Sequence, residues 1–518
     1  MFPQRVEYLR QFGRFQRNAR LYLISNVLSG VTTGILLVLY NLYLASLGYG
    51  TDFIGIVLFV VTIGAGIAIF PAGICIDRLS GRFILIWSSL LIGLAGMGQI
   101  LFRQPIPLLI SGFIAGAAGA FVLVINAPFL TRNSTPAERP HLFSLNLVLG
   151  LITGVIGSVL GGALPGWFHG IPLLMGPLPA WLNGLFASQA NPRSYQLALL
   201  FAGVIALPSF IPLFLMSDDR PGRVVQASGE GRNVEESRRG GGGADDGRGP
   251  LWPPVPATDQ KSALQITSTE RAATRAPSLP GTTPAPTRIH FTRIRSRFHI
   301  MSTLSQLGHT PLLLLALVQA FIGAGAGLFI PYFNVYFVQH LGASPALFGV
   351  LNGGATAINA MLTLAAPWLA MRLGKVNATV LTELVSIPLL IAIGLIPLLP
   401  VAAVCYLLRQ GFMDMSNGVL QVFSMEVVPE RYRGLANSSY QVAFQVPWAL
   451  TAPLGGILIA HVGYPPVFLG GAVCYLLACG TLWGNFGGGK EKRFVEVNKV
   501  AEKTRPSEER MGREKLRS

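Results

Sequence analysis

The segment YNLYLASLGYG, residues Tyr40–Gly50, returns with little change later in the chain as FNVYFVQHLGAS, residues Phe333–Ser344. Both copies carry an asparagine and a tyrosine two residues apart, then a Leu-Gly pair, then a second glycine seven residues further on. The matched positions are Asn41 with Asn334, Tyr43 with Tyr336, Gly48 with Gly342, and Gly55 with Gly349. This agreement predicts that one structural unit occurs twice in the chain.

The composition is that of a membrane protein. Of the 518 residues, 51% are hydrophobic and 12% are charged, whereas about 25% are charged in soluble domains. A helix needs about 20 mostly apolar residues to cross a bilayer. Twelve stretches qualify: residues 21–46, 53–76, 83–102, 106–130, 142–168, 196–216, 311–338, 346–370, 377–399, 401–426, 437–461 and 465–485. We therefore expect an all-α membrane protein with twelve transmembrane helices.

Polar stretches divide the chain into five parts. We expect an N-terminal segment 1–20, a six-helix bundle 21–216, a linker 217–305, a second six-helix bundle 306–485 and a charged tail 486–518. The linker contains RRGGGGADDGRG and PSLPGTTPAPTR, a composition that buries too little apolar surface to fold. It ends in RIHFTRIRSRFHI, which suits either a strip on an anionic membrane surface or a solvated run of charges.

Basic residues set the expected orientation. The net charge is +16, and 36 of the 39 lysines and arginines fall in the two ends, the linker and the loops of one face. Such residues collect on the cytoplasmic side of membrane proteins, which explains the charge better than nucleic-acid binding does. The exceptions are Arg103 and Arg193 in loops of the other face, and Arg409 within a span. We expect a multi-pass protein of the cell (inner) membrane with both termini cytoplasmic.

Other segments also repeat in the same order. After the fourth and tenth spans, Arg139 precedes Ser144 by five residues as Arg433 precedes Ser438. The fifth span carries GSVLGG and the eleventh carries APLGG. Because the two halves have the same orientation, they are parallel repeats about an axis along the membrane normal.

The loop after the second span gives a family resemblance. GICIDRLSGR, residues Gly73–Arg82, is followed in the second half by the shorter echo MRLGK, residues Met371–Lys375. Through this loop and its twelve repeated helices, the chain resembles the major facilitator superfamily of secondary transporters. Two positions depart from the family's motif: Ser80 stands where a glycine is usual, and Met371 replaces the acid.

The resemblance implies a conformational latch at the cytoplasmic ends of the helices. An acid at a helix end can meet a helix N-terminus or an arginine of the other half, holding the halves together in one state and releasing them in the other. The plainer alternative is a charged loop that only sets topology. The expected latch residues are Gly73, Asp77, Arg78, Arg82, Arg139, Arg372, Lys375 and Arg433.

The subfamily is less well defined. GSVLGG is similar to the fifth-helix glycine motif of the family's antiporters, with Ser158 where a proline is usual. Glycines also allow close helix packing without any role in efflux. The signatures of sugar porters and of peptide symporters are missing.

Ionisable residues inside spans are costly and therefore suggest function. Asp414 lies near the middle of its span, and Glu383 lies about 10 Å from a span end at 1.5 Å per residue. We expect one of them to couple protons, with a structural hydrogen bond or a position near the interface as the alternatives. Arg409 and Asp414 are separated by about 140° around the helix, so they need not pair.

A solute site should lie near the membrane midplane between the two repeats. Mid-span polar and aromatic residues are the candidates, and helix packing is the alternative role of each. They are Thr32, Asn41, Gln319, Tyr332, Asn334, Asn359, Arg409, Gln445 and Trp448. One cation among several aromatic side chains suits an amphiphilic or weakly anionic solute.

These features predict a secondary active transporter that works by alternating access, with proton-coupled efflux of amphiphilic compounds as the first choice. An uptake permease or uncoupled facilitator for a small metabolite is one alternative, and a sensor without flux is another. We expect a monomer in the lipid bilayer, with no nucleic-acid partner, metal or cofactor. The four cysteines, Cys75, Cys405, Cys474 and Cys479, are expected to fill core space. Without a phosphate loop or a nucleophile motif, the chain is not expected to be an enzyme.

Overall fold

Regular structure in this protein is helical throughout the described part of the chain. A computed structural model describes residues 15–135, 138–177, 179, 185–218, 311–428 and 433–490. These residues belong to one compact unit. Nearly all of the expected linker, most of the N-terminal segment and most of the charged tail lie outside the described residues.

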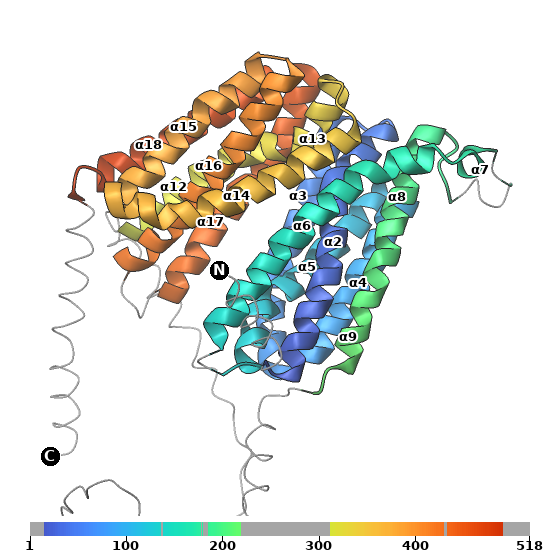
Figure 1. The fold of residues 1–518 in the computed structure, drawn as a ribbon, viewed down its shortest axis with the longest axis horizontal. Helices are drawn as coiled ribbons and strands as arrows, with labels where there is room; N and C mark the ends of the chain where they lie inside the picture. Colours follow the sequence, from blue (N-terminus) through green and yellow to red (C-terminus); the bar gives the residue numbers. More distant parts are fainter. Residues whose placement is uncertain are drawn as a thin grey trace, which may run out of the picture. The chain divides into compact units, whose positions relative to one another are not determined.

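The first half contains six long helical segments. They are α2 (Arg17–Ser46), α3 (Thr51–Arg78), α4 (Gly81–Leu101), α5 (Pro105–Arg132), α6 (Arg139–His169), and α8 (Ala190–Ala206), which continues through η1 (Leu207–Ser209) into α9 (Phe210–Leu215). A short helix, α7 (Pro172–Met175), lies in the connection before α8. In Figure 1 these helices are drawn in blue to green and form one bundle.

The second half also contains six, drawn in yellow to red in Figure 1. The first runs from α12 (Pro311–Phe329) through η2 (Ile330–Tyr332) and α13 (Phe333–Val335) to a π-helical turn, η3 (Tyr336–His340). The others are α14 (Pro345–Leu373), α15 (Lys375–Leu395), α16 (Leu399–Val427), α17 (Arg433–His461) and α18 (Pro465–Phe486). The expected fold class is confirmed: eleven of the segments in the described residues are long and apolar enough to cross a membrane, and the less apolar α16 makes the twelfth.

Prolines explain two departures from the expected spans. The span expected over residues 377–399 was drawn too long, because α15 ends at Leu395 and its C-cap, Ile396, is extended (φ −109°, ψ 93°). Ile396 precedes Pro397, and the residue before a proline avoids the helical region. The seventh span is broken at η2, where Pro331 supplies no N–H for the helical ladder.

The repeated tyrosines perform the same task in both halves. Tyr43 Oη on α2 donates to the carbonyl of Ile100 at 2.7 Å. Tyr336 Oη donates to the carbonyl of Ile393, the same 57 residues further along the chain. In each half this buried bond ties the first helix to the third, so the repeat found in the sequence is also a repeat in structure.

Glycines bring the two halves into contact. Helix α6 packs along α14, and α3 packs along α17. At the first crossing, a Cβ added to Gly162 would lie 2.9 Å from Gly349 Cα. At the second, a Cβ on Gly55 would lie 2.7 Å from Pro453 Cα. Side chains at these positions would force the backbones apart, which explains why these glycines sit in the repeated segments.

Candidate functional site

A cavity of about 640 Å³ opens between the two halves and is the candidate solute site. Helices α2, α3, α4 and α5 form its N-terminal wall; the broken α12–α13 segment, α14, α16 and α17 form the other. Its polar lining consists of Thr33, Tyr40, Asn41, Thr62, Gln99, Asn334, Asn352, Thr356, Asn359, Tyr406, Gln410, Asp414 and Trp448. Most of these side chains are amides and hydroxyls, which bind solutes through hydrogen bonds.

Asp414 is the charged side chain of this cavity. The described lining residues include this one carboxylate and no lysine, arginine or histidine. Asp414 is half-buried on α16, and Gln410 Nε2, one turn earlier on α16, donates to its Oδ2 at 2.9 Å. No cation of the described residues lines the cavity beside this carboxylate, although the buried Arg409 on the same helix acts on it electrostatically. A partly enclosed carboxylate favours a proton or a cationic ligand.

Aromatic rings form much of the remaining wall, from Tyr40, Phe333, Phe348, Tyr406 and Trp448. Tyr406 Oη donates to Asn352 Oδ1 at 2.9 Å. The same amide donates to Ser158 Oγ on α6 at 2.9 Å. This chain of bonds links α16, α14 and α6, and so joins the two halves beside the cavity.

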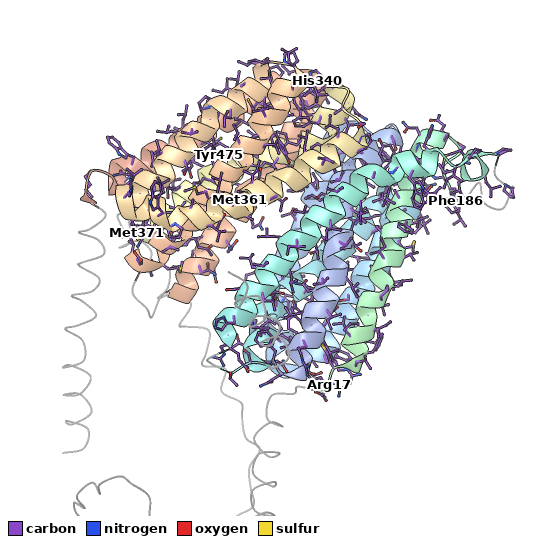
Figure 2. The ribbon with its side chains drawn as sticks, in the orientation of Figure 1. Arg17, Phe186, His340, Met361, Met371 and Tyr475 are labelled. Atoms are coloured by element: carbon purple, nitrogen blue, oxygen red, sulfur yellow. The ribbon has the colours of Figure 1, made fainter. Side chains whose placement is uncertain are left out.

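Arg409 lies behind this wall, away from the cavity. Its side chain is fully buried, and its guanidinium carbon is 4.7 Å from the ring centre of Phe329 and 5.6 Å from that of Tyr475. Nη2 donates to Tyr475 Oη at 3.1 Å; Nε and Nη1 have no hydrogen-bond partner among the described residues. Tyr475, labelled on the C-terminal bundle in Figure 2, is itself fully buried.

Glu383 is also fully buried. Its carboxylate accepts hydrogen bonds from Ser416 Oγ at 3.3 Å and Cys479 Sγ at 3.1 Å. The side chain therefore does not reach the membrane interface, which had been one of the sequence-based alternatives. Cys479, expected only to fill core space, serves as a donor, and all four cysteines are free thiols.

The expected solute-binding residues fall into two groups. Asn41, Asn334, Asn359 and Trp448 line the cavity. Thr32, Gln319, Tyr332, Arg409 and Gln445 are not among its lining residues. Thr32 Oγ1 instead donates to the Ala202 carbonyl at 3.1 Å, and Tyr332 Oη donates to the Ala452 carbonyl at 2.5 Å. The solute-binding role of both groups stays a prediction.

The repeated asparagines form a reciprocal pair across the two halves. Asn41 Nδ2 donates to the carbonyl of Pro331 at 2.7 Å, and Asn334 Nδ2 donates to the carbonyl of Val38 at 3.1 Å. Both side chains are almost completely buried, at 8% and 4% exposed. We call these two hydrogen bonds the asparagine pair.

For two expected latch residues of the first half, the structure describes contacts within that half. Arg82 Nη2 donates to the Phe214 carbonyl at 2.7 Å, and Arg139 Nη2 donates to the Thr131 carbonyl at 3.3 Å. Gly73 and the exposed Arg78 lie on the last turns of α3. The side chains of Asp77 and Arg433 lie outside the described residues.

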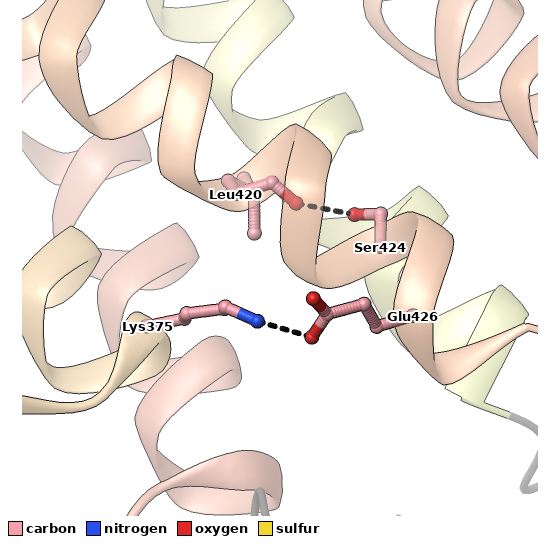
Figure 3. Close-up of polar contacts among 4 residues, drawn as sticks. All are labelled: Lys375, Leu420, Ser424 and Glu426. Carbon is pink, nitrogen blue, oxygen red and sulfur yellow. Dashed lines mark hydrogen bonds and ion pairs between the residues drawn. The ribbon is translucent and has the colours of Figure 1, made fainter. Parts of the chain in front are cut away.

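The loop between α14 and α15, the second copy of this motif, also makes contacts within its own half. Lys375, at the start of α15, pairs with Glu426, near the end of α16 (Figure 3). Arg372 stacks on Trp368, with its guanidinium carbon 4.6 Å from the ring centre. The ion pair joins the neighbouring helices α15 and α16, whereas the stack lies within α14. A latch between the bundles stays a prediction.

Several residues of the site were not foreseen. Gln410 could have been found from its spacing, because residues four apart on a helix are neighbours and Asp414 follows it by four. Asn352 lies seven residues before Asn359, on the same face of α14. Ser416, Cys479 and Tyr475 offered no such signal, because they join Glu383 and Arg409 from other turns or helices.

Comparison with known proteins now assigns the chain. A family model described as the Major Facilitator Superfamily matches residues 22–452, and a further match covers residues 315–511. The chain belongs to the Major Facilitator Superfamily. With this fold and the central cavity, it is a membrane transporter rather than an enzyme.

Solved transporters have the same fold. A bacterial homologue of the human lysosomal transporter Spinster, inward-facing and unoccupied, is 14% identical with a TM-score of 0.59, over 92% of this chain and 97% of that one. An inward-facing bacterial homologue of the iron transporter ferroportin is 17% identical with a TM-score of 0.59, over 90% and 98%. The inward-open xylose transporter XylE from E. coli is 14% identical with a TM-score of 0.59, over 92% and 98%. At these identities the likeness concerns the fold.

Proposed function

We propose that this superfamily member exports small amphiphilic organic cations in exchange for protons, by alternating access around the cavity. The observation that carries the proposal is the cavity lining, in which Asp414 is the charged group and no basic side chain is present among the described residues. The sequence suggested an amphiphilic or weakly anionic solute, and the proposal keeps the amphiphilic character with a positive charge. That suggestion placed Arg409 in the cavity, whereas its guanidinium is buried against Phe329, Phe333 and Tyr475.

The rest of the lining suits the same class of solute. Aromatic faces attract cations through their quadrupoles, and Tyr406, Trp448 and Phe333 supply such faces. Amide groups of Asn352, Asn359 and Gln410 accept or donate hydrogen bonds to a polar head, while apolar rings accommodate a hydrophobic body. The solute is therefore an organic monocation with an apolar portion.

Exchange with protons follows from the single carboxylate. A proton and a cationic solute both neutralise Asp414, and the site holds one of them at a time. Binding of the solute therefore releases the proton, and arrival of the proton on the other side releases the solute. Glu383, sealed inside the C-terminal bundle by Ser416 and Cys479, is the second candidate for the proton.

Orientation gives this exchange its direction. We place both termini in the cytoplasm, because 36 of 39 basic residues fall on that face or in the linker and ends. The protein is taken to be a monomer in the cell membrane. An exception on the other face, Arg193, is 3% exposed and donates to the carbonyls of Leu174, Gly176, Ala187 and Ser188. It serves as a structural clamp of the α7 connection, so it does not weaken the orientation.

The test is solute-induced proton release in inside-out vesicles carrying a pH dye. The panel contains lipophilic monocations, weak acids and sugars. We compare the wild type with Asp414→Asn, Glu383→Gln, and Asp52→Asn, whose carboxyl lies in the first turn of α3 outside the cavity. We expect monocations alone to release protons, a loss of at least tenfold in D414N, and wild-type behaviour in D52N.

Other outcomes are informative. A response lost in E383Q but kept in D414N moves the proton site into the C-terminal bundle. Flux of radiolabelled solute without a proton signal favours an uncoupled facilitator. A response to sugars or weak acids and not to monocations contradicts the proposed solute class, and binding without flux favours a sensor.

A further inference from the structure

We infer that the asparagine pair, Asn41 with Asn334, is the gate bond that holds the two halves closed on the side opposite the termini. The two residues are positioning residues that set the balance between inward-facing and outward-facing states. This role is separate from the solute binding that the sequence predicts for them. It depends on the fold and the orientation, and not on the identity of the solute.

The first argument is the reciprocity of the bonds. Each amide lies in one half and donates to a backbone carbonyl of the other, Asn41 to Pro331 and Asn334 to Val38. Each amide nitrogen therefore donates a hydrogen bond across the boundary between the halves. Because the halves move as bodies in alternating access, both bonds must break together when this end opens.

The break in the seventh span provides one acceptor. In a regular helix the N–H of Val335 would bond to the Pro331 carbonyl, four residues earlier. Here that N–H donates to Asn334 Oδ1 at 2.9 Å. Asn334 Oδ1 thus accepts the Val335 N–H, and its Nδ2 donates to the Val38 carbonyl. The Pro331 carbonyl accepts the hydrogen bond from Asn41 Nδ2. One local distortion serves both bonds of the pair.

The surrounding contacts place the pair at one end of the molecule. Two other hydrogen bonds in the described residues join the halves at this same end, Thr51 Oγ1 to the Gly456 carbonyl at 2.9 Å and Asn352 to Ser158. By the proposed orientation this end faces outward. The cavity borders the pair, because both asparagines are among its lining residues. The pair therefore forms the outer boundary of the solute site.

The experiment measures the gate directly, without any solute. Nitroxide labels are placed at Gln104→Cys and Gln339→Cys, two exposed positions at this end, one in each half. The full chain, with its native cysteines changed to serine, is reconstituted in lipid nanodiscs. Pulsed electron paramagnetic resonance then gives the populations of short and long distances. A net contribution typical of one hydrogen bond corresponds to about fivefold in this ratio.

We expect Asn41→Ala and Asn334→Ala each to raise the long-to-short ratio about fivefold, and the double variant about 30-fold. Tyr43→Phe and Tyr336→Phe are matched controls, since they remove repeated bonds made within one half. They should leave the ratio unchanged. If the double variant fails to fold, the single variants decide, because each keeps one bond.

Two results would overturn the inference. One is a wild-type distance ratio in both folded asparagine variants. The other is an equal shift in the tyrosine controls, which would mean that any loosening of the bundles opens this end. Neither result bears on the solute class, and failure of the transport panel leaves the gate measurement intact.

Discussion

At the residue scale, the arginines on α14 and α16 show how burial changes the free energy that a cation–π contact contributes. Arg409 is fully buried among Phe329, Phe333 and Tyr475. Arg372 makes a similar stack on Trp368, whose side chain is 53% exposed. A cation over a ring contributes about 0.5–1 kcal/mol at an exposed site and about 2 or more when desolvated.

We therefore predict that Arg409→Lys lowers the stability of the purified protein by about 2 kcal/mol, although the charge is kept. An ammonium cannot reproduce the planar stack of a guanidinium, and the bond to Tyr475 is lost. Arg372→Lys should cost less than about 1 kcal/mol. Thermal unfolding in detergent compares the two, and equal melting temperatures would contradict the desolvation argument.

At the scale of elements, the crossing of α6 and α14 depends on the absence of side chains. A Cβ on Gly162 would lie 2.5 Å from the Pro345 carbonyl oxygen and 3.0 Å from Ala346 Cα. A Cβ on Gly150, earlier on α6, meets nothing within 4 Å. The same substitution on one helix thus encounters another backbone at one site and open space at the other.

Gly162→Ala should therefore destabilise the protein by about 1–3 kcal/mol through overpacking, and should lengthen the Gln104–Gln339 label distance. Gly150→Ala should be neutral or stabilising by up to about 1 kcal/mol, because alanine favours the helix. Melting temperatures and label distances check both changes. An unchanged melting temperature in G162A would contradict the overpacking argument, because it would show that α6 and α14 can move apart without a loss of stability.

At the scale of the whole molecule, orientation decides which end the asparagine pair closes. Gln104 and Asn377 are exposed and lie at opposite ends of the helices, before α5 and at the start of α15. A membrane-impermeant maleimide applied to intact cells should label Gln104→Cys and leave Asn377→Cys unlabelled until the cells are permeabilised. The reverse labelling pattern would mean that the orientation is opposite to the one proposed and that the gate lies on the cytoplasmic side.

The membrane class, the helices and their duplication could all be predicted from the amino-acid sequence. Length and hydropathy of a span are local properties, so the expected helices were found, apart from the end set by Pro397. The paired segments around Asn41 and Asn334 revealed the repeat, and the loop at Gly73–Arg82 revealed the family. Each of these signals lies within a few consecutive residues.

Which polar residues contact one another depends on how the helices pack. The spacing of Arg409 and Asp414 gives the angle between them around the helix, but not which neighbour each side of the helix meets. They could therefore not be assigned to core and cavity from their spacing alone. The hydrogen-bond donors to Glu383 lie 33 and 96 residues away in the sequence. The acceptor of Asn41, the Pro331 carbonyl, lies 290 residues away in the sequence. Contacts over such separations depend on how the packed helices are rotated and on where α12 breaks, and these are properties of the assembled bundles.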